Sequence, residues 1–77
     1  MTRDDLEADL RTLPDVRDVS VTGNGTLVAT VVSGSFESQD ESVRQAAVWK
    51  LLHERHTSNE LRNVEFIFTN APGDTDG

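Results

Sequence analysis

The sequence of 77 residues is the size of one small domain, with 35% hydrophobic residues and no cysteine. A chain of this length is close to the lower limit at which one hydrophobic core stabilises a fold. The missing thiols exclude disulfides, cysteine nucleophiles and thiolate ligands within this chain. Acidic residues number 14 against 7 basic ones, a net charge of −7. Because nucleic-acid affinity comes mainly from basic side chains on phosphates, this charge disfavours nucleic acid as a partner.

The acidity also fits a salt-adapted, halophilic host, where molar salt shortens the Debye length to about 3 Å and weakens repulsion between carboxylates. No segment approaches the roughly 20 apolar residues of a membrane-spanning helix. The N-terminal stretch MTRDDLEADL has neither the basic segment nor the apolar core of a secretory signal. We therefore expect a cytoplasmic protein with no membrane partner.

The first predicted element is a helix over residues 4–12. Leu6, Leu10 and Leu13 fall on one stripe, which predicts a single buried face. Thr2, with an acidic residue three positions later, indicates a capping box, and the proline at position 14 marks the end.

A hairpin follows. Residues 16–22 place Val19 and Val21 on one face, and residues 27–32 form the returning, more buried strand. The Gly-Asn-Gly run at 23–25 tolerates positive φ and predicts the turn between them. A phosphate-binding role for this run is disfavoured, because it does not precede a helix N-terminus.

A second helix is predicted over residues 40–56, opened by a capping box of Ser38 and Glu41. Its main apolar arc consists of Val43, Ala47, Val48, Leu51 and Leu52, with Arg44 inside it. Trp49 lies outside this arc. Burial between the two helices is the simpler interpretation for this tryptophan, and exposure at an interface is the alternative.

The last strand covers residues 64–69, with Val64, Phe66 and Phe68 on one face and Ile67 on the other. The order α-β-β-α-β predicts an α+β domain over residues 1–70, with a three-stranded mixed sheet covered on one face by two helices. Residues 71–77 are expected to form a flexible acidic tail.

No pattern of residues predicts catalysis. The serines lack a G-x-S-x-G context, and no carboxylate pair stands out. His53 and His56 are not at the spacing of a zinc-protease helix, so we interpret both as solvated residues near a helix C-terminus. The chain is therefore expected to be non-enzymatic.

The central region resembles the BolA family. Ser33-x-x-Phe36, then Arg44, Val48-Trp49 and Leu52, are similar to the family's S-x-x-F-x-G, R-H and V-Y-x-x-L motifs. Residues 63–72, NVEFIFTNAP, are similar to its H-A-L-S-L-x-T-x-T-P run. The resemblance implies an α-β-β-α-β core related to type II KH domains. It also implies a regulatory protein that binds monothiol glutaredoxins and shares an iron–sulfur cluster with them through a histidine.

The departures from this pattern concern the metal-competent positions. Asn63 stands where the family has its histidine before the last strand, and Gln45 stands at the histidine of its R-H pair. The family's long loop between the first two strands is reduced to the turn at 23–25. We therefore expect no cofactor and no metal ligation.

These observations predict a binding or adaptor domain with a protein partner that is glutaredoxin-like or regulatory. Its expected surface consists of Gln45, Trp49, His53, Arg62 and Asn63. The alternative is a KH-like nucleic-acid-binding or transcription-regulatory domain that uses Arg44, Arg55 and Arg62. The sequence lacks the basic G-x-x-G loop with which KH domains approach the nucleic-acid backbone.

Overall fold

The first helix, α1 (Arg3–Leu10), begins at the predicted cap. The Thr2 hydroxyl accepts a hydrogen bond from the backbone N–H of Asp5 at 3.1 Å, which satisfies one of the free donors of the first turn. Leu6 and Leu10 are fully buried. In this computed structural model, which describes residues 1–75, α1 ends two residues earlier than predicted. Pro14 disfavours helical backbone at the residue before it, so the chain leaves the helix through turns.

The predicted hairpin is confirmed. β1 (Val16–Thr22) and β2 (Leu27–Ser33) pair antiparallel, with Val19 opposite Val31. Gly23 adopts φ +109°, and a Cβ atom there would lie 1.9 Å from the backbone oxygen of Thr26. The turn therefore requires glycine at this position.

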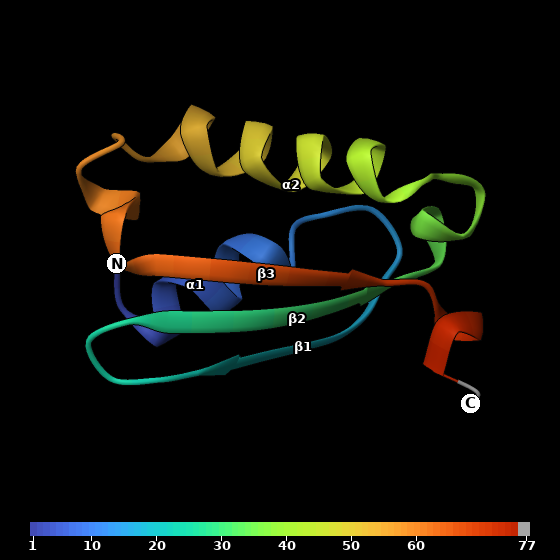
Figure 1. Cartoon of the computed structure of the whole chain (residues 1–77), viewed down its shortest axis with the longest axis horizontal. Helices are drawn as coiled ribbons and strands as arrows, with labels where there is room; N and C mark the ends of the chain where they lie inside the picture. Colours follow the sequence, from blue (N-terminus) through green and yellow to red (C-terminus); the bar gives the residue numbers. More distant parts are fainter. Residues whose placement is uncertain (76–77) are drawn as a thin grey trace.

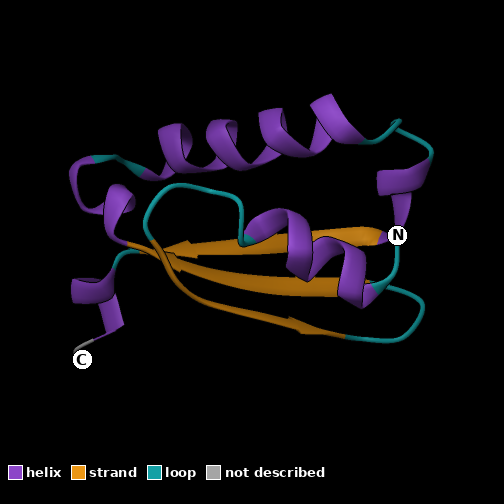
Figure 2. Ribbon diagram, turned by 180° about the vertical axis from the view of Figure 1, so that it is seen from behind, coloured by secondary structure: helices purple, strands orange, loops and turns teal. Residues whose placement is uncertain are grey.

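The sheet is mixed, as predicted. β3 (Val64–Asn70) pairs parallel to β2, and the strand order β1-β2-β3 makes β3 an edge strand. α2 (Glu41–Arg55) forms the crossover between β2 and β3 (Figure 1). Both helices lie over the same face of the sheet (Figure 2), α1 against β1 and α2 against β3. The predicted α+β class and α-β-β-α-β order are confirmed.

The core lies between the two helices and this covered face. Its largest fully buried side chains come from both helices, two strands and the short 3₁₀ helix η1 (Gly34–Ser38): Leu6, Leu10, Leu27, Val31, Phe36, Val48, Leu52 and Ile67. Phe36 is brought inward by a cap at Ser33, whose hydroxyl accepts from the Ser35 N–H at 3.1 Å and donates to the Pro14 carbonyl at 2.6 Å. The Ser-x-x-Phe spacing thus closes the end of β2 over the core.

The second helix differs from prediction at its start and in its orientation. Its N-cap is Asp40, whose carboxylate accepts from the Val43 N–H at 3.0 Å, so the expected capping box at Ser38 is wrong. Val43 is 47% exposed, whereas Val48 and Leu52 are fully buried. The sheet-facing side is therefore rotated away from Val43, because polar residues of α2 bind the edge of β3.

Phe66 and Phe68 share a face of β3 opposite Ile67, as predicted, but Val64 does not lie with them. Ile67 and Thr69 are buried with Val64, while Phe66 and Phe68 are 38% and 50% exposed. The strand pairing is irregular where Leu27 faces Val64 and Val28 faces Phe66. This irregularity, which alternation alone does not reveal, separates Val64 from the two phenylalanines.

The C-terminal segment begins with a buried residue. Ala71 is 2% exposed, and Pro72–Thr75 form a short 3₁₀ helix, η3. The final two residues of the predicted acidic tail lie outside the described residues, so the flexibility of 71–77 stays a prediction. Within residues 1–75, no helix is both long and apolar enough to cross a membrane.

Candidate functional site

The predicted partner surface divides into two groups. Gln45, Trp49 and His53 follow one another along α2 on the side that meets the free edge of β3. Arg62 and Asn63 lie in η2 (Glu60–Asn63), the 3₁₀ helix that leads into β3.

Gln45 is a structural residue at the centre of the first group. Its Nε2 atom lies 2.7 Å from the Ile67 carbonyl oxygen, 3.3 Å from Thr69 Oγ1 and 3.1 Å from Glu41 Oε1. Its Oε1 atom accepts from Trp49 Nε1 at 3.1 Å. Since an amide has only two donor hydrogens, this side chain is fully engaged.

Successive contacts between α2 and β3 move forward along the helix and backward along the strand. Thr69 Oγ1 donates to Glu41 at 2.8 Å, and Gln45 binds Ile67 one helical turn later. Four residues advance about 6 Å along a helix, and two residues advance about 6.6 Å along a strand. α2 and the edge of β3 therefore lie side by side and antiparallel.

Trp49 is half-buried, with its indole N–H bound to Gln45 and its ring centroid 6.2 Å from that of His53. The expected burial between the two helices is wrong, because the indole is held on the β3 side of α2. Its exposed part and the exposed His53 form a small aromatic surface beside the sheet edge.

Asn63 ties distant segments together. Its Oδ1 atom accepts from the Met1 backbone nitrogen at 2.9 Å, and its Nδ2 atom donates to the carbonyl oxygens of Met1 at 2.8 Å and Gly25 at 3.2 Å. The short β1–β2 turn is what brings the Gly25 carbonyl within reach. Both polar atoms of the Asn63 side chain are therefore hydrogen-bonded to backbone groups of the fold.

The interpretation of both histidines as solvated is wrong for His56. Its Nε2 atom binds Asp9 of α1, and its Nδ1 atom lies 3.6 Å from Glu60 Oε2. The hydrogen bond to Asp9, supported by Glu60, raises the pKa of His56 above its usual value. Residues 1–75 hold no group of three or more His, Cys, Asp or Glu arranged to bind a metal ion.

The three arginines of the nucleic-acid alternative do not come together. Arg44 donates to the carbonyls of Gln39 at 2.9 Å and Thr69 at 3.1 Å. Arg55 pairs with Asp9 of α1 at 3.3 Å, about 16 Å farther along α2. Arg62 lies in η2 and contacts Asn59 at 3.4 Å. Each guanidinium is therefore engaged in a contact within the fold, and no shared basic surface results from these residues.

The arrangement of the whole chain matches solved structures. BolA1 from Arabidopsis thaliana superposes with a TM-score of 0.70 over 95% of this chain and 94% of its own, at 14% sequence identity. The BolA domain of SufE1 from Arabidopsis thaliana superposes with a TM-score of 0.68 over 92% of each chain, also at 14% identity. The protein has a BolA-like fold. No protein-family profile and no curated protein matches the sequence.

The residues of this BolA-like domain do not fit the iron–sulfur cluster that the family resemblance implies. The chain has no cysteine, and the two positions where the resemblance places histidines carry amides. Gln45 and Asn63 donate their amide hydrogens to backbone carbonyls of the fold. An amide is a poor substitute for imidazole or thiolate on iron, and releasing either side chain would leave those carbonyls unpaired.

Sequence reasoning found these positions but not their role. In the sequence, Asn63 and Gln45 stand out only because they replace the family's histidines. Their hydrogen bonds span 38 and 22 positions in the chain, so no local pattern reveals them. The exposure of Phe66 and Phe68 was also missed, because apolar alternation indicates two faces without indicating which one is covered.

Proposed function

We propose that this BolA-like domain is a non-enzymatic binding or adaptor module that acts through a protein partner and does not ligate an iron–sulfur cluster. The observation that carries the proposal is the use of the Gln45 and Asn63 amides within the fold. The scaffold is retained while the positions that would hold a metal serve its stability. The proposal assigns no catalytic residue.

The accessible part of the predicted surface is smaller than expected. With Gln45 and Asn63 engaged internally, it consists of Trp49, His53 and Arg62. Tryptophan and arginine are enriched among residues that dominate binding energy at protein interfaces. These three side chains are the ones we expect to contribute to partner contacts.

The absence of cluster ligation is tested with a monothiol glutaredoxin that carries a [2Fe–2S] cluster. Addition of the chain should leave the visible absorption and circular dichroism of the cluster unchanged. The matched variant Asn63→His restores an imidazole at that position and serves as the comparison. A wild-type chain that shifts the spectrum, or that forms a cluster-bridged complex in gel filtration, contradicts this part of the proposal.

The protein partner is tested by affinity purification from an extract of the source organism at molar salt. The wild-type chain should retain a stoichiometric protein, and the double variant His53→Ala, Arg62→Ala should lose it. Val43→Ser, an exposed apolar position on another side of α2, is the matched control and should retain the protein. Equal recovery with all three chains contradicts the proposed surface.

The nucleic-acid alternative is the less supported one, since Arg44, Arg55 and Arg62 are separated and each is engaged within the fold. A filter-binding titration with single-stranded and duplex DNA at both low and molar salt decides it. Saturable binding that Arg55→Ala and Arg62→Ala weaken would favour this alternative over the protein partner.

A further inference from the structure

The face of the sheet opposite the helices is open. In β2 the residues Leu27, Ala29 and Val31 are buried toward the helices, so the alternate residues point to the open side. The strand register then places three rows on this face: Asp18, Ser20 and Thr22 of β1; Val28, Thr30 and Val32 of β2; Phe66, Phe68 and Asn70 of β3. The row on the central strand is half-buried.

The apolar surface of this face is concentrated on β3 and the neighbouring part of β2. Phe66 is 38% and Phe68 50% exposed, and their ring centroids lie 4.6 Å apart at an interplanar angle of 41°. They stand opposite Val28 and Thr30 of β2. Two adjacent exposed aromatic rings beside a valine make a continuous apolar surface, which soluble proteins usually keep for binding.

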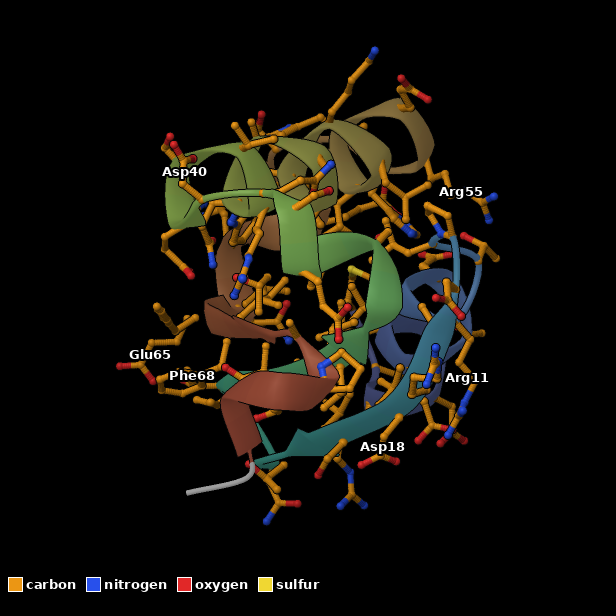
Figure 3. The ribbon with its side chains drawn as sticks, turned by 90° about the vertical axis from the view of Figure 1, so that its right-hand side faces the viewer. Arg11, Asp18, Asp40, Arg55, Glu65 and Phe68 are labelled. Atoms are coloured by element: carbon orange, nitrogen blue, oxygen red, sulfur yellow. The ribbon has the colours of Figure 1, made fainter. Side chains whose placement is uncertain are left out.

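Carboxylates lie on both sides of this face. Glu65 projects from the same side of the molecule as Phe68, and Asp18 lies on the β1 side (Figure 3). None of the strand residues in the three rows is basic. Arg17 of β1 lies at the strand irregularity and pairs with Asp15 at 3.1 Å. An apolar centre with an acidic border is complementary to apolar side chains flanked by lysine or arginine.

We propose that the open sheet face around Phe66 and Phe68 binds a basic, apolar peptide segment of a partner protein. This inference rests on the proposed function and adds the chemistry of the partner. A second copy of the chain would bring another net charge of −7 to an acidic face. A nucleic acid would bring phosphates to the same carboxylates, so the basic peptide is the occupant that the charges favour.

The mode of binding follows from the edge of β3. Arg44 and Gln45 already occupy the outward carbonyls of Thr69 and Ile67. A partner therefore cannot pair a strand with this stretch without displacing them. The segment should instead lie across the open face and bind through its side chains, aromatic or aliphatic groups on the two rings and cations toward Asp18 and Glu65.

The test begins with phage-displayed random 12-residue peptides selected on the immobilised chain. Enriched peptides should combine lysine or arginine with aromatic or large aliphatic residues. A synthetic copy of the most enriched peptide is then titrated into ¹⁵N-labelled chain. Amide shifts should concentrate at Phe66, Phe68 and Val28, and the double variant Phe66→Ser, Phe68→Ser should weaken binding by at least about tenfold, as for loss of interface anchors.

Val43→Ser is the matched control, since Val43 is as exposed as the phenylalanines but lies on α2. It should leave the affinity within about twofold, as expected of a residue outside the interface. Asp18→Asn should weaken binding at low salt and have little effect at high salt. The spectrum of the free double variant shows whether its fold is kept. We expect that it is, because neither phenylalanine belongs to the buried core.

Several results would overturn the inference. They are failure to enrich any peptide, enrichment of acidic peptides, tighter binding of oligo(dT) than of the peptide, and self-association through the two phenylalanines in sedimentation. Peptide shifts confined to Trp49 and His53 would overturn it while leaving the proposed function intact. Cluster ligation in the glutaredoxin experiment would overturn that part of the proposed function while leaving this face untouched.

Discussion

At the scale of single residues, the amides of Gln45 and Asn63 connect segments that are far apart in the chain. Gln45 connects α2 to the edge strand through Ile67 and Thr69 and also holds the indole of Trp49. A glutamine offers both a donor and an acceptor group, and this site uses both. Edge strands expose unpaired backbone groups to other chains, so the contact also protects β3 from unwanted pairing.

We therefore expect Gln45→Ala to lower the free energy of unfolding by about 1–3 kcal/mol, because it leaves partly buried acceptors unpaired. Gln45→Glu keeps the shape of the side chain but removes both donor hydrogens, so it should destabilise the domain at neutral pH as well. Urea denaturation measures both effects. Lys50→Ala, an exposed change on α2, should stay within about 0.5 kcal/mol of wild type. A Gln45→Glu chain as stable as wild type would show that the hydrogen bonds contribute nothing.

At the scale of elements, the N-cap of α2 was predicted two residues too early, at Ser38 instead of Asp40. Ser38 and Glu41 have the spacing of a capping box, yet Ser38 belongs to the preceding 3₁₀ helix η1. The Val43 N–H, and then the Ser42 hydroxyl, bind the Asp40 carboxylate and lower its pKa below the usual value. Because the folded-state pKa is lowered, this contribution is present above the unfolded pKa and is lost as pH falls through the folded one.

We expect Asp40→Ala to lower the melting temperature by about 4–8 °C, the usual effect of losing an N-cap in a domain of this size. Ser38→Ala should change the melting temperature by about 2 °C or less, since it removes no helix cap. Circular dichroism melts at pH 7 and pH 3 make the comparison. The difference between Asp40→Ala and wild type should shrink at the lower pH. A larger loss from Ser38→Ala than from Asp40→Ala would restore the original capping prediction.

At the scale of the whole molecule, the two helices meet through charged side chains at one end of the core. His56, just past the end of α2, binds Asp9 of α1 and lies near Glu60 of η2, and Arg55 pairs with the same aspartate. Asp9, first, and Glu60 raise the pKa of His56 in the folded state. The stabilisation from its charge is therefore fully present below the unfolded pKa and is lost as pH rises through the folded pKa.

We expect His56→Asn to destabilise the domain by about 0.2–1 kcal/mol at pH 6, the range for an ion pair with access to solvent. At pH 9 the loss should be smaller, because the wild-type imidazole is then neutral. His53→Asn, a change at an exposed position one turn earlier, is the matched control. Urea denaturation of the three chains at both pH values measures the difference. A loss from His56→Asn that is equal at both values would mean that packing, not charge, joins the helices here.

Local pattern by itself determined the strands, the hairpin turn and the order of the elements. Alternation over residues 16–22, the Gly-Asn-Gly run and the leucine stripe of α1 depend on neighbours along the chain. The resemblance at Ser33, Phe36, Arg44 and Leu52 also led to the correct fold, because these spacings preserve the core and the closure of β2. Such spacings do not determine which partner the protein binds or what role it has.

Only the tertiary structure decided which side of each element is covered. Val43 and Leu52 are equally apolar in the sequence, yet one is 47% exposed and the other fully buried. The exposure of Phe66 and Phe68, the engagement of Gln45 and Asn63 and the contact of His56 with Asp9 likewise depend on segments far apart in the chain. The physical reason is that propensity and capping are local, whereas the covered face of an element is set by the surfaces packed against it and by the polar groups it must satisfy.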